Sequence, residues 1–195
     1  DFGVAVLTGH GSDWHLALDR GTREINPTSA IELSASELLV ATQRDGVLYV
    51  RLSADGGRIE QQRPLQVADG IRYGAIARAE VSTRTDGSVV ASTATGLYRW
   101  SGKGFEQLRI EGLGTDESGM HTVLQFAAAP DGSEWAWGDD HIYHRHDSVA
   151  WHASAIDAIL SGFVESIGFD DDGSVLFGGA SLLLQYNRAL APVPA

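Results

Sequence analysis

The segment 139–146, with the sequence DDHIYHRH, carries the residue types best suited to metal chemistry. Residues two apart on a strand share a face, so His144 and His146 could both ligate a metal through imidazole nitrogens, with Asp139 or Asp140 adding a carboxylate. The same pattern fits the polar face of an ordinary strand. No second ligand cluster has a spacing that would obviously complete the site. We therefore predict no bound metal and keep His144 and His146 as the candidate ligands.

Two other segments contain reactive residue types without the pattern that a reactive site needs. The acidic run 170–174 looks like a calcium loop, but an EF-hand needs alternating oxygen donors followed by a terminal Glu, and residues 175–177 supply none. The run 10–13 contains His, Ser and Asp, but a catalytic triad is a spatial arrangement that adjacency in a turn does not create. We expect turns at both places, no cofactor, and no enzymatic activity of the chain itself.

Composition excludes several classes of partner. The 195 residues include 14 Lys and Arg against 26 Asp and Glu, for a formal net charge of −12, and no Lys/Arg cluster. Such a field repels nucleic acids and anionic membrane surfaces. Apolar runs such as 155–164 are too short to cross a bilayer, so we expect no membrane insertion within this chain. The absence of cysteine excludes disulfides and thiolate metal sites, and it suits either the cytosol or the periplasm.

The elements that position these residues are short strands. In 80–109 apolar and polar residues alternate, and turn residues at Asp86-Gly87, Thr95-Gly96 and 102–104 interrupt the alternation. This pattern predicts four antiparallel strands joined by tight turns. Small or apolar residues on both faces of 89–93 favour a strand packed between two neighbouring sheets.

The same unit recurs along the chain. An Asp-Gly-Ser turn followed by a strand appears with its glycine at Gly87, Gly132 and Gly173, and the spacings of 45 and 41 residues are typical of four-stranded propeller blades. We predict an all-β fold, a β-propeller of four-stranded antiparallel blades in one domain over 1–195. About five repeats are expected, at approximately 1–30, 31–78, 79–122, 123–163 and 164–195. They form either a five-bladed ring or part of a larger propeller.

Two pieces of the chain resemble a known repeat family. Residues 164–179 match the first half of the two-component-regulator propeller repeat, and Thr93 to Trp100, followed by Gly102-Lys103-Gly104-Phe105, match the second half. This family forms the extracytoplasmic sensor propellers of bacterial signalling proteins. The resemblance implies a periplasmic or extracytoplasmic, non-enzymatic sensor. It implies a small-molecule or protein ligand, and a membrane-anchored signalling module in the same polypeptide as a further partner.

By analogy with propellers, ligands sit on the face built from two kinds of loop: those joining the second strand to the third, and those leading from the last strand to the next blade. Rigid scaffolds concentrate function in such loops. The candidate ligand-binding residues on this basis, together with the less constrained Trp137, are Arg44, Asp45, Arg72, Tyr73, His121, Asp139, Asp140 and His141.

Two alternative functions stay open at this stage. A propeller glycosidase or lyase predicts acids or histidines that converge on the ring centre. A carbohydrate-binding lectin predicts equivalent aromatic and polar sites in successive blades.

Overall fold

The computed structural model describes residues 6–10, 13–18, 26–113, 121–138, 141–146, 150–153, 164–179 and 182–187. Its elements are β-strands, apart from the short 3-10 helix η1 at Val67–Asp69, which confirms the all-β prediction. The described residues include no helix with the length and hydropathy that spanning a membrane requires. The chain divides into two compact units, with unit 1 formed by Asp1–Ser82 and Val89–Leu108, and unit 2 by Thr83–Ser88 and Arg109–Ala195.

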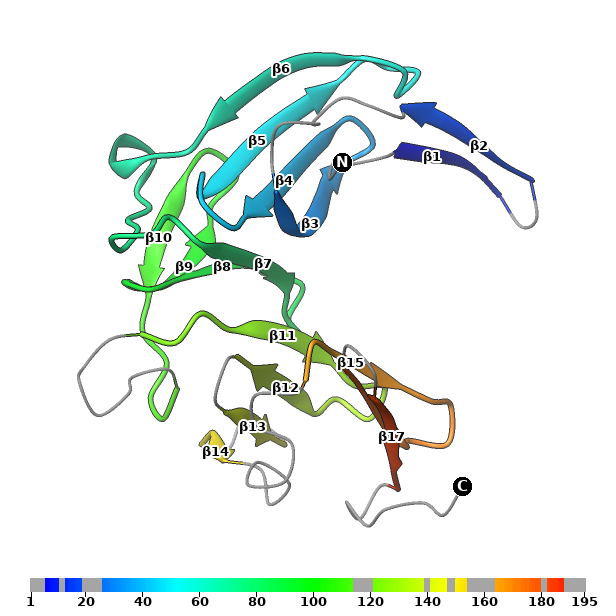
Figure 1. Cartoon of the computed structure of the whole chain (residues 1–195), viewed down its shortest axis with the longest axis vertical. Helices are drawn as coiled ribbons and strands as arrows, with labels where there is room; N and C mark the ends of the chain where they lie inside the picture. Colours follow the sequence, from blue (N-terminus) through cyan, green and yellow to red (C-terminus); the bar gives the residue numbers. More distant parts are fainter. Residues whose placement is uncertain are drawn as a thin grey trace. The chain divides into compact units, whose positions relative to one another are not determined.

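Unit 1 contains a hairpin and two four-stranded antiparallel sheets whose strands neighbour one another in chain order (Figure 1). The hairpin pairs β1 (Val6–His10) with β2 (Asp13–Leu18). The first sheet consists of β3 (Pro27–Ser34), β4 (Glu37–Thr42), β5 (Val47–Leu52) and β6 (Ile59–Pro64). The second consists of β7 (Ala79–Thr83), β8 (Val89–Thr93), β9 (Gly96–Trp100) and β10 (Phe105–Leu108), which are the four strands predicted for 80–109.

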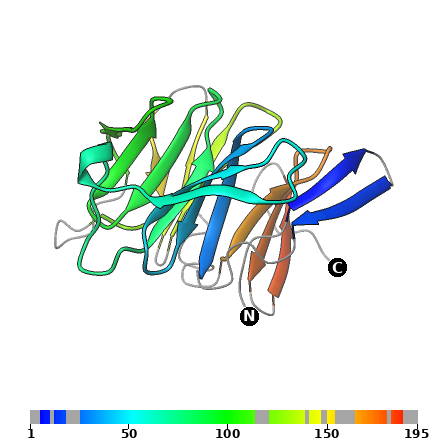
Figure 2. The ribbon, with the colours of Figure 1, turned by 90° about the horizontal axis from the view of Figure 1, so that it is seen from above.

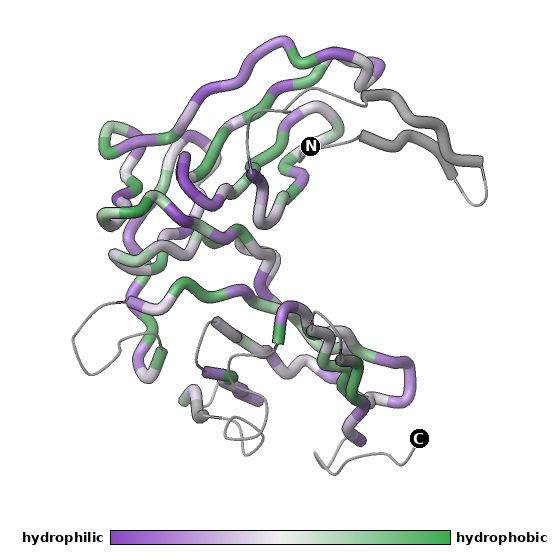
Figure 3. Tube along the Cα trace, in the orientation of Figure 1, coloured by the Kyte–Doolittle hydropathy of each residue, from purple (hydrophilic) through white to green (hydrophobic). Residues whose placement is uncertain are grey.

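The two sheets of unit 1 share one hydrophobic core. Leu39 and Ala41 of β4 pack with Val81 of β7 and Ala91 of β8. The opposite face of the first sheet is apolar too, because Val40 packs with Leu48 and other residues of β5. The outermost strand β6 is mostly hydrophilic along its trace (Figure 3) and alternates between half-buried and exposed residues. The inner strands thus bury both faces, as expected for a blade between neighbours.

Unit 2 contains a four-stranded and a three-stranded antiparallel sheet, again with strands in chain order. Figure 2 shows the strands of each sheet lying side by side when seen from above. The strands are β11 (Gln125–Ala128), β12 (Glu134–Trp137), β13 (Ile142–Arg145) and β14 (His152–Ala153), then β15 (Ser166–Phe169), β16 (Val175–Gly179) and β17 (Leu182–Tyr186). Trp135 of β12 meets Phe177 of β16 edge to face, with ring centroids 5.7 Å apart, so these two sheets also share a core.

The Asp-Gly-Ser turns have the same geometry in all three copies. Gly87, Gly132 and Gly173 have φ values of 77°, 83° and 84°, which glycine adopts without strain. In each turn the aspartate accepts a hydrogen bond from the backbone N–H of the following serine, at 2.9, 2.9 and 2.7 Å. The repeated motif is therefore a set of side-chain-braced hairpin turns. The acidic run at 170–174 contains one of them. That the whole chain forms one propeller domain with the repeat boundaries given above stays a prediction.

A buried charge cluster lies in unit 2. The Glu134 side chain is 1% exposed, and its carboxylate accepts two hydrogen bonds from Arg84, Nε to Oε1 at 2.8 Å and Nη2 to Oε2 at 2.6 Å. Arg145 donates from Nε to Oε2 at 2.9 Å, and the Thr85 N–H donates to Oε1 at 3.2 Å. The guanidinium groups stack on aromatic rings, Arg84 on Phe126 and Arg145 on Trp151. Burial alone would raise the pKa of Glu134, but the bonds and charges of the two arginines outweigh it and hold the pKa below its ordinary value.

We predict that Glu134→Gln destabilises the chain by about 3–5 kcal/mol, because Arg84 and Arg145 then lose the buried carboxylate that binds both of them. The control Glu106→Gln removes an acid that is 63% exposed and lies 3.5 Å from Arg99, and it should change the free energy of unfolding by less than about 1 kcal/mol. Urea denaturation of the full chain measures both. Equal effects of the two substitutions would contradict the prediction.

The same carboxylate makes stability depend on pH. In the folded chain the pKa of Glu134 is lowered from its ordinary value of 4.5, chiefly by the hydrogen bond and charge of Arg84. Its stabilising contribution is therefore present above pH 4.5 and disappears as the pH falls through the lowered pKa. The Glu134→Gln variant should lack this part of the acid sensitivity, which urea titrations at a series of acidic pH values will show.

Candidate functional site

A pocket of about 360 Å³ lies in unit 1, at the end of the second sheet where the 65–78 connection meets the turn between β8 and β9. We call it the Arg72 pocket, and it is lined by Val67, Gly70, Arg72, Thr95, Tyr98 and Gln107. Its volume falls in the range of roughly 300–1,000 Å³ found for small-molecule sites. The 65–78 connection leads from a last strand to the next sheet, and 94–95 joins a second strand to a third. These are the two kinds of loop in which we expected ligand-binding residues.

Tyr73 fixes the 65–78 connection to the first sheet. Its hydroxyl accepts a hydrogen bond from the Val47 N–H and donates one to the Leu65 carbonyl, both at 3.0 Å. A Cβ at Gly46, whose φ is 71°, would overlap the Tyr73 ring, so glycine is needed where the ring covers the backbone. Burial raises the pKa of Tyr73 to about 12. We predicted Tyr73 as a ligand-binding residue, and the structure gives it an anchoring role beneath the loop.

The start of the same connection is fixed by Asp69 and Gly70. The Asp69 carboxylate accepts hydrogen bonds from Arg63 Nη1 at 2.8 Å and from the Gln66 N–H at 2.9 Å. Burial opposes ionisation, but these bonds outweigh it and keep the pKa of Asp69 below its ordinary value. Gly70 has φ 86°, and a Cβ there would overlap the Phe105 carbonyl oxygen of β10. The backbone of one wall is thus held close to the last strand of the sheet.

Two threonine hydroxyls hold the backbone of Arg72. Thr93 and Thr95 both donate from Oγ1 to the Arg72 carbonyl, at 2.9 and 2.8 Å. The Tyr98 hydroxyl lies 2.9 Å from Thr95 Oγ1 and extends the network to the floor of the pocket. The exposed Arg72 side chain therefore extends from a fixed backbone position.

The pocket offers binding groups. Among its six lining residues only Arg72 carries a charge, and none is an Asp, Glu, His, Cys or Lys that could act as a general base. Within the described part of the chain no partner engages the Arg72 guanidinium or the Gln107 side-chain amide. Two polar side chains are thus available to a ligand on walls whose backbone is already ordered.

The other predicted residues of unit 1 lie at the neighbouring turn between β4 and β5. Asp45 forms a parallel β-bridge with Ala77, at the far end of the 65–78 connection, and its N–H donates to Thr42 Oγ1 at 2.8 Å. Arg44 is exposed beside it. The fold therefore places Arg44 and Asp45 against the same connection that carries Arg72 and Tyr73.

The predicted residues of unit 2 lie in varied environments. Half-buried His121 bonds through Nδ1 to the Thr122 carbonyl at 2.9 Å, and burial lowers its pKa. His141 meets Tyr143 edge to face, with ring centroids 5.8 Å apart. Trp137 is 5% exposed and belongs to the core, so its indole offers little surface to a ligand. Asp139 and Asp140 lie outside the described residues.

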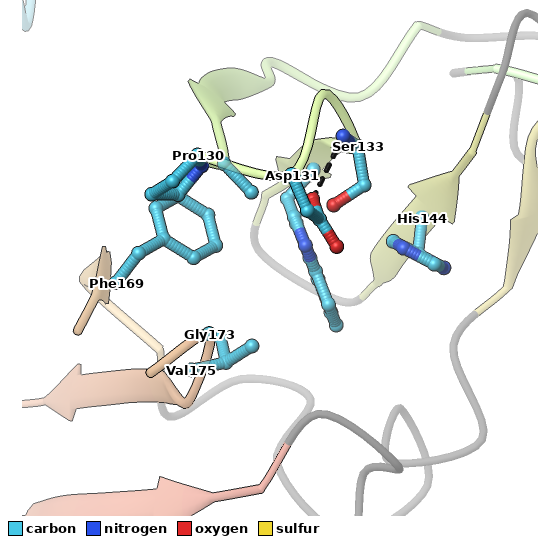
Figure 4. A pocket seen from close by; sticks show the side chains of 9 residues that line it. Pro130, Asp131, Ser133, His144, Phe169, Gly173 and Val175 are labelled. Atoms are coloured by element: carbon cyan, nitrogen blue, oxygen red, sulfur yellow. Dashed lines mark hydrogen bonds between the residues drawn. The ribbon is translucent and has the colours of Figure 1, made fainter. Parts of the chain in front are cut away.

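A second, smaller cavity in unit 2 contains His144. It measures about 70 Å³ and is lined by Ala129, Pro130, Asp131, Ser133, Trp135, His144, Phe169, Gly173 and Val175. Figure 4 shows Phe169 on one side of it and His144 on the other. His144 packs on Trp135, with ring centroids 4.5 Å apart. This volume is well below the roughly 300 Å³ at which small-molecule sites begin. Across the described ranges no group of three or more His, Cys, Asp or Glu residues could hold a metal ion, and His144 and His146 stay candidates only.

Sequence reasoning missed part of the Arg72 pocket. Thr95 stands in a turn that the sequence marks, so applying the loop rule to this repeat would have found it. Gln107 lies on the outer strand β10, and no sequence signal indicates that its amide faces the pocket. Val67 is 65% exposed and lies in the short helix η1, and no sequence signal indicates that it lines the pocket.

We predict that Tyr73→Phe lowers the free energy of unfolding by about 1–3 kcal/mol, because the Val47 N–H and the Leu65 carbonyl lose a buried partner. The raised pKa has a second effect. The folded chain favours the neutral phenol, so this contribution is intact below the ordinary pKa of 10.0 and is lost as the pH rises toward about 12. Denaturation series at alkaline pH should show a smaller loss of stability in Tyr73→Phe than in the wild type, and parallel losses would contradict this.

Comparisons with known proteins found similar structures but no similar sequence family. No family model matches the chain, and no curated protein matches it. The chain is similar to the extracellular domain of a hybrid two-component system from B. thetaiotaomicron, with a TM-score of 0.61 and 14% identity over 87% of this chain and 22% of that one. It is also similar to a second such domain from B. thetaiotaomicron, with a TM-score of 0.54 and 12% identity over 100% of this chain and 25% of the other.

A third similar structure is YCF48 bound to a D1 peptide, with a TM-score of 0.51 and 15% identity over 94% of this chain and 58% of YCF48. The chain spans about a quarter or less of the two extracellular domains. At such low identities the likeness concerns the fold. The fold of this chain matches part of the extracellular propeller domains of bacterial two-component systems.

Proposed function

We propose that this chain is part of a ligand-sensing β-propeller in an extracytoplasmic bacterial signalling protein, and that it binds a small molecule in the Arg72 pocket. The chain itself is non-enzymatic in this proposal, and a membrane-anchored module of the same polypeptide receives the signal. The likeness to extracellular domains of two-component systems supports the setting.

The observation that carries the proposal is the place and construction of the pocket. It lies at the loop end of a sheet, where propellers commonly bind ligands, and its volume of about 360 Å³ suits a small molecule. Tyr73, Gly70 and the two threonines order the walls before any ligand arrives. A ligand that enters an ordered pocket loses less affinity to the ordering of side chains and loops.

The enzyme alternative receives no support from the lining of this pocket. A glycosidase or lyase would need acids or histidines at the reacting bond. The polar groups of the lining are one guanidinium, one amide and two hydroxyls. These groups position a ligand, so recognition is the function that the pocket favours.

A thermal-shift screen of the 195-residue chain tests the proposal. The panel contains monosaccharides, disaccharides, amino acids and organic acids. At least one class should raise the Tm in a concentration-dependent manner, since ligand at about 100 times Kd stabilises a protein by about 2.7 kcal/mol. The variant Gln107→Trp, which fills the pocket from β10, should abolish the response.

The matched control is Gln62→Trp, an exposed position on β6, which is the corresponding outer strand of the first sheet and lies outside the pocket. It should respond as the wild type does. A panel without any stabilising compound would contradict the proposed function. So would a response that Gln107→Trp leaves intact, because binding would then occur elsewhere.

A further inference from the structure

We infer that the Arg72 pocket selects an anionic ligand, a small molecule whose carboxylate or phosphate group binds the Arg72 guanidinium. This inference rests on the proposed function, because it names the ligand class of the same site.

The first observation is that Arg72 forms no ion pair with the acids of the described residues. Several other arginines of the described residues form ion pairs with acids, namely Arg51, Arg58, Arg63, Arg84, Arg99 and Arg145. Arg72 lines a pocket and has no such partner in the described part of the chain. Acids outnumber bases by 26 to 14 in this protein, so partners for a guanidinium are plentiful. A guanidinium on a pocket wall that pairs with no acid of the described residues can therefore bind an anion.

Asp69, the acid in the adjoining helix η1, pairs with Arg63 and does not pair with Arg72. Asp69 is bound by Arg63 Nη1 at 2.8 Å and by the Gln66 N–H at 2.9 Å. Its lowered pKa shows that the carboxylate is already stabilised by these partners. The positive charge of Arg72 is thus left facing the pocket.

The hydroxyl groups in and beside the pocket already have hydrogen-bond partners in the protein, so Arg72 and Gln107 are the side chains available to a ligand. Thr93 and Thr95 both direct their hydroxyl hydrogens to the Arg72 carbonyl, at 2.9 and 2.8 Å. The Tyr98 hydroxyl lies 2.9 Å from Thr95 Oγ1, so it already has a hydrogen-bond partner within the protein. A guanidinium can only donate, so the ligand group that binds Arg72 must be an acceptor, while the Gln107 amide can donate or accept.

Anionic acceptors fit this site better than neutral ones. Carboxylate and phosphate oxygens can accept two parallel hydrogen bonds from a guanidinium, and such charge-assisted bonds are roughly twice as strong as neutral ones. The exposed Val67 side chain on the same wall provides an apolar contact for the body of the ligand.

Isothermal titration of the full chain with matched probes tests the inference. One set is phenylacetate, phenylacetamide and benzyl phosphate, and the other is glucuronate, glucuronamide and glucose 6-phosphate. In at least one set an anion should bind more tightly than its amide by about tenfold or more, since a hydrogen bond to a charged group contributes roughly 1.5–3 kcal/mol. The carboxylate and phosphate arms show which anion the pocket prefers.

Three variants locate the effect. Arg72→Gln should weaken binding of the preferred anion by about 10- to 100-fold. Arg72→Lys should bind the anion with an affinity between those of the wild type and Arg72→Gln, because it keeps the positive charge and loses the planar guanidinium group. Arg58→Gln removes the same charge at the 53–58 turn between β5 and β6, outside the pocket, and should leave binding unchanged.

Two results would overturn the inference. One is an absence of binding by every anion in both sets, and the other is an anion that binds Arg72→Gln as tightly as the wild type. In either case the proposed function survives if a neutral compound still stabilises the chain in a manner that Gln107→Trp abolishes. The two proposals therefore fail separately.

Discussion

The structure depends on burying both faces of its inner strands. On β4, Leu39 and Ala41 face the core shared with the second sheet, while Val40 faces the opposite way into another apolar cluster. A single sheet cannot shield both faces, so each sheet needs a neighbour. In unit 1, Leu39 and Val81 belong to the hydrophobic core that two sheets share. In unit 2, Trp135 and Phe177 belong to the core that the other two sheets share.

This packing gives the loops a rigid base. Tyr73 reaches from the 65–78 connection to the start of β5, and Thr93 at the end of β8 binds the Arg72 carbonyl. Both anchors are attached to strands whose positions the core fixes. The walls of the Arg72 pocket are therefore ordered by hydrogen bonds that do not use the groups left for a ligand.

The two units contain arginines in contrasting environments. In unit 2, Arg84 and Arg145 both pair with the buried carboxylate of Glu134. Arg84 is itself buried, where an unpaired charge would be very unfavourable. In unit 1, Arg72 is exposed to solvent, where a guanidinium needs no partner to be stable. The arginines bound to Glu134 support the fold, whereas the exposed Arg72 is the arginine that we propose for ligand recognition.

The sequence by itself determined the four strands of the sheet at 80–109 and the three Asp-Gly-Ser turns, because these depend on neighbouring residues. Alternation over 80–109 and turns such as Asp86-Gly87 specify local backbone geometry, and the repeat spacing follows from them. The same loop argument named Arg72 as a candidate ligand-binding residue, which stays a prediction, and the structure shows that Arg72 lines a pocket. Only the tertiary structure decided that Tyr73 is an anchor, that Gln107 shares the pocket with Arg72, and that Glu134 pairs with Arg84. The physical reason is distance along the chain. Arg84 and Glu134 are 50 residues apart and Tyr73 is 26 from Val47, so those contacts exist only once the sheets have packed.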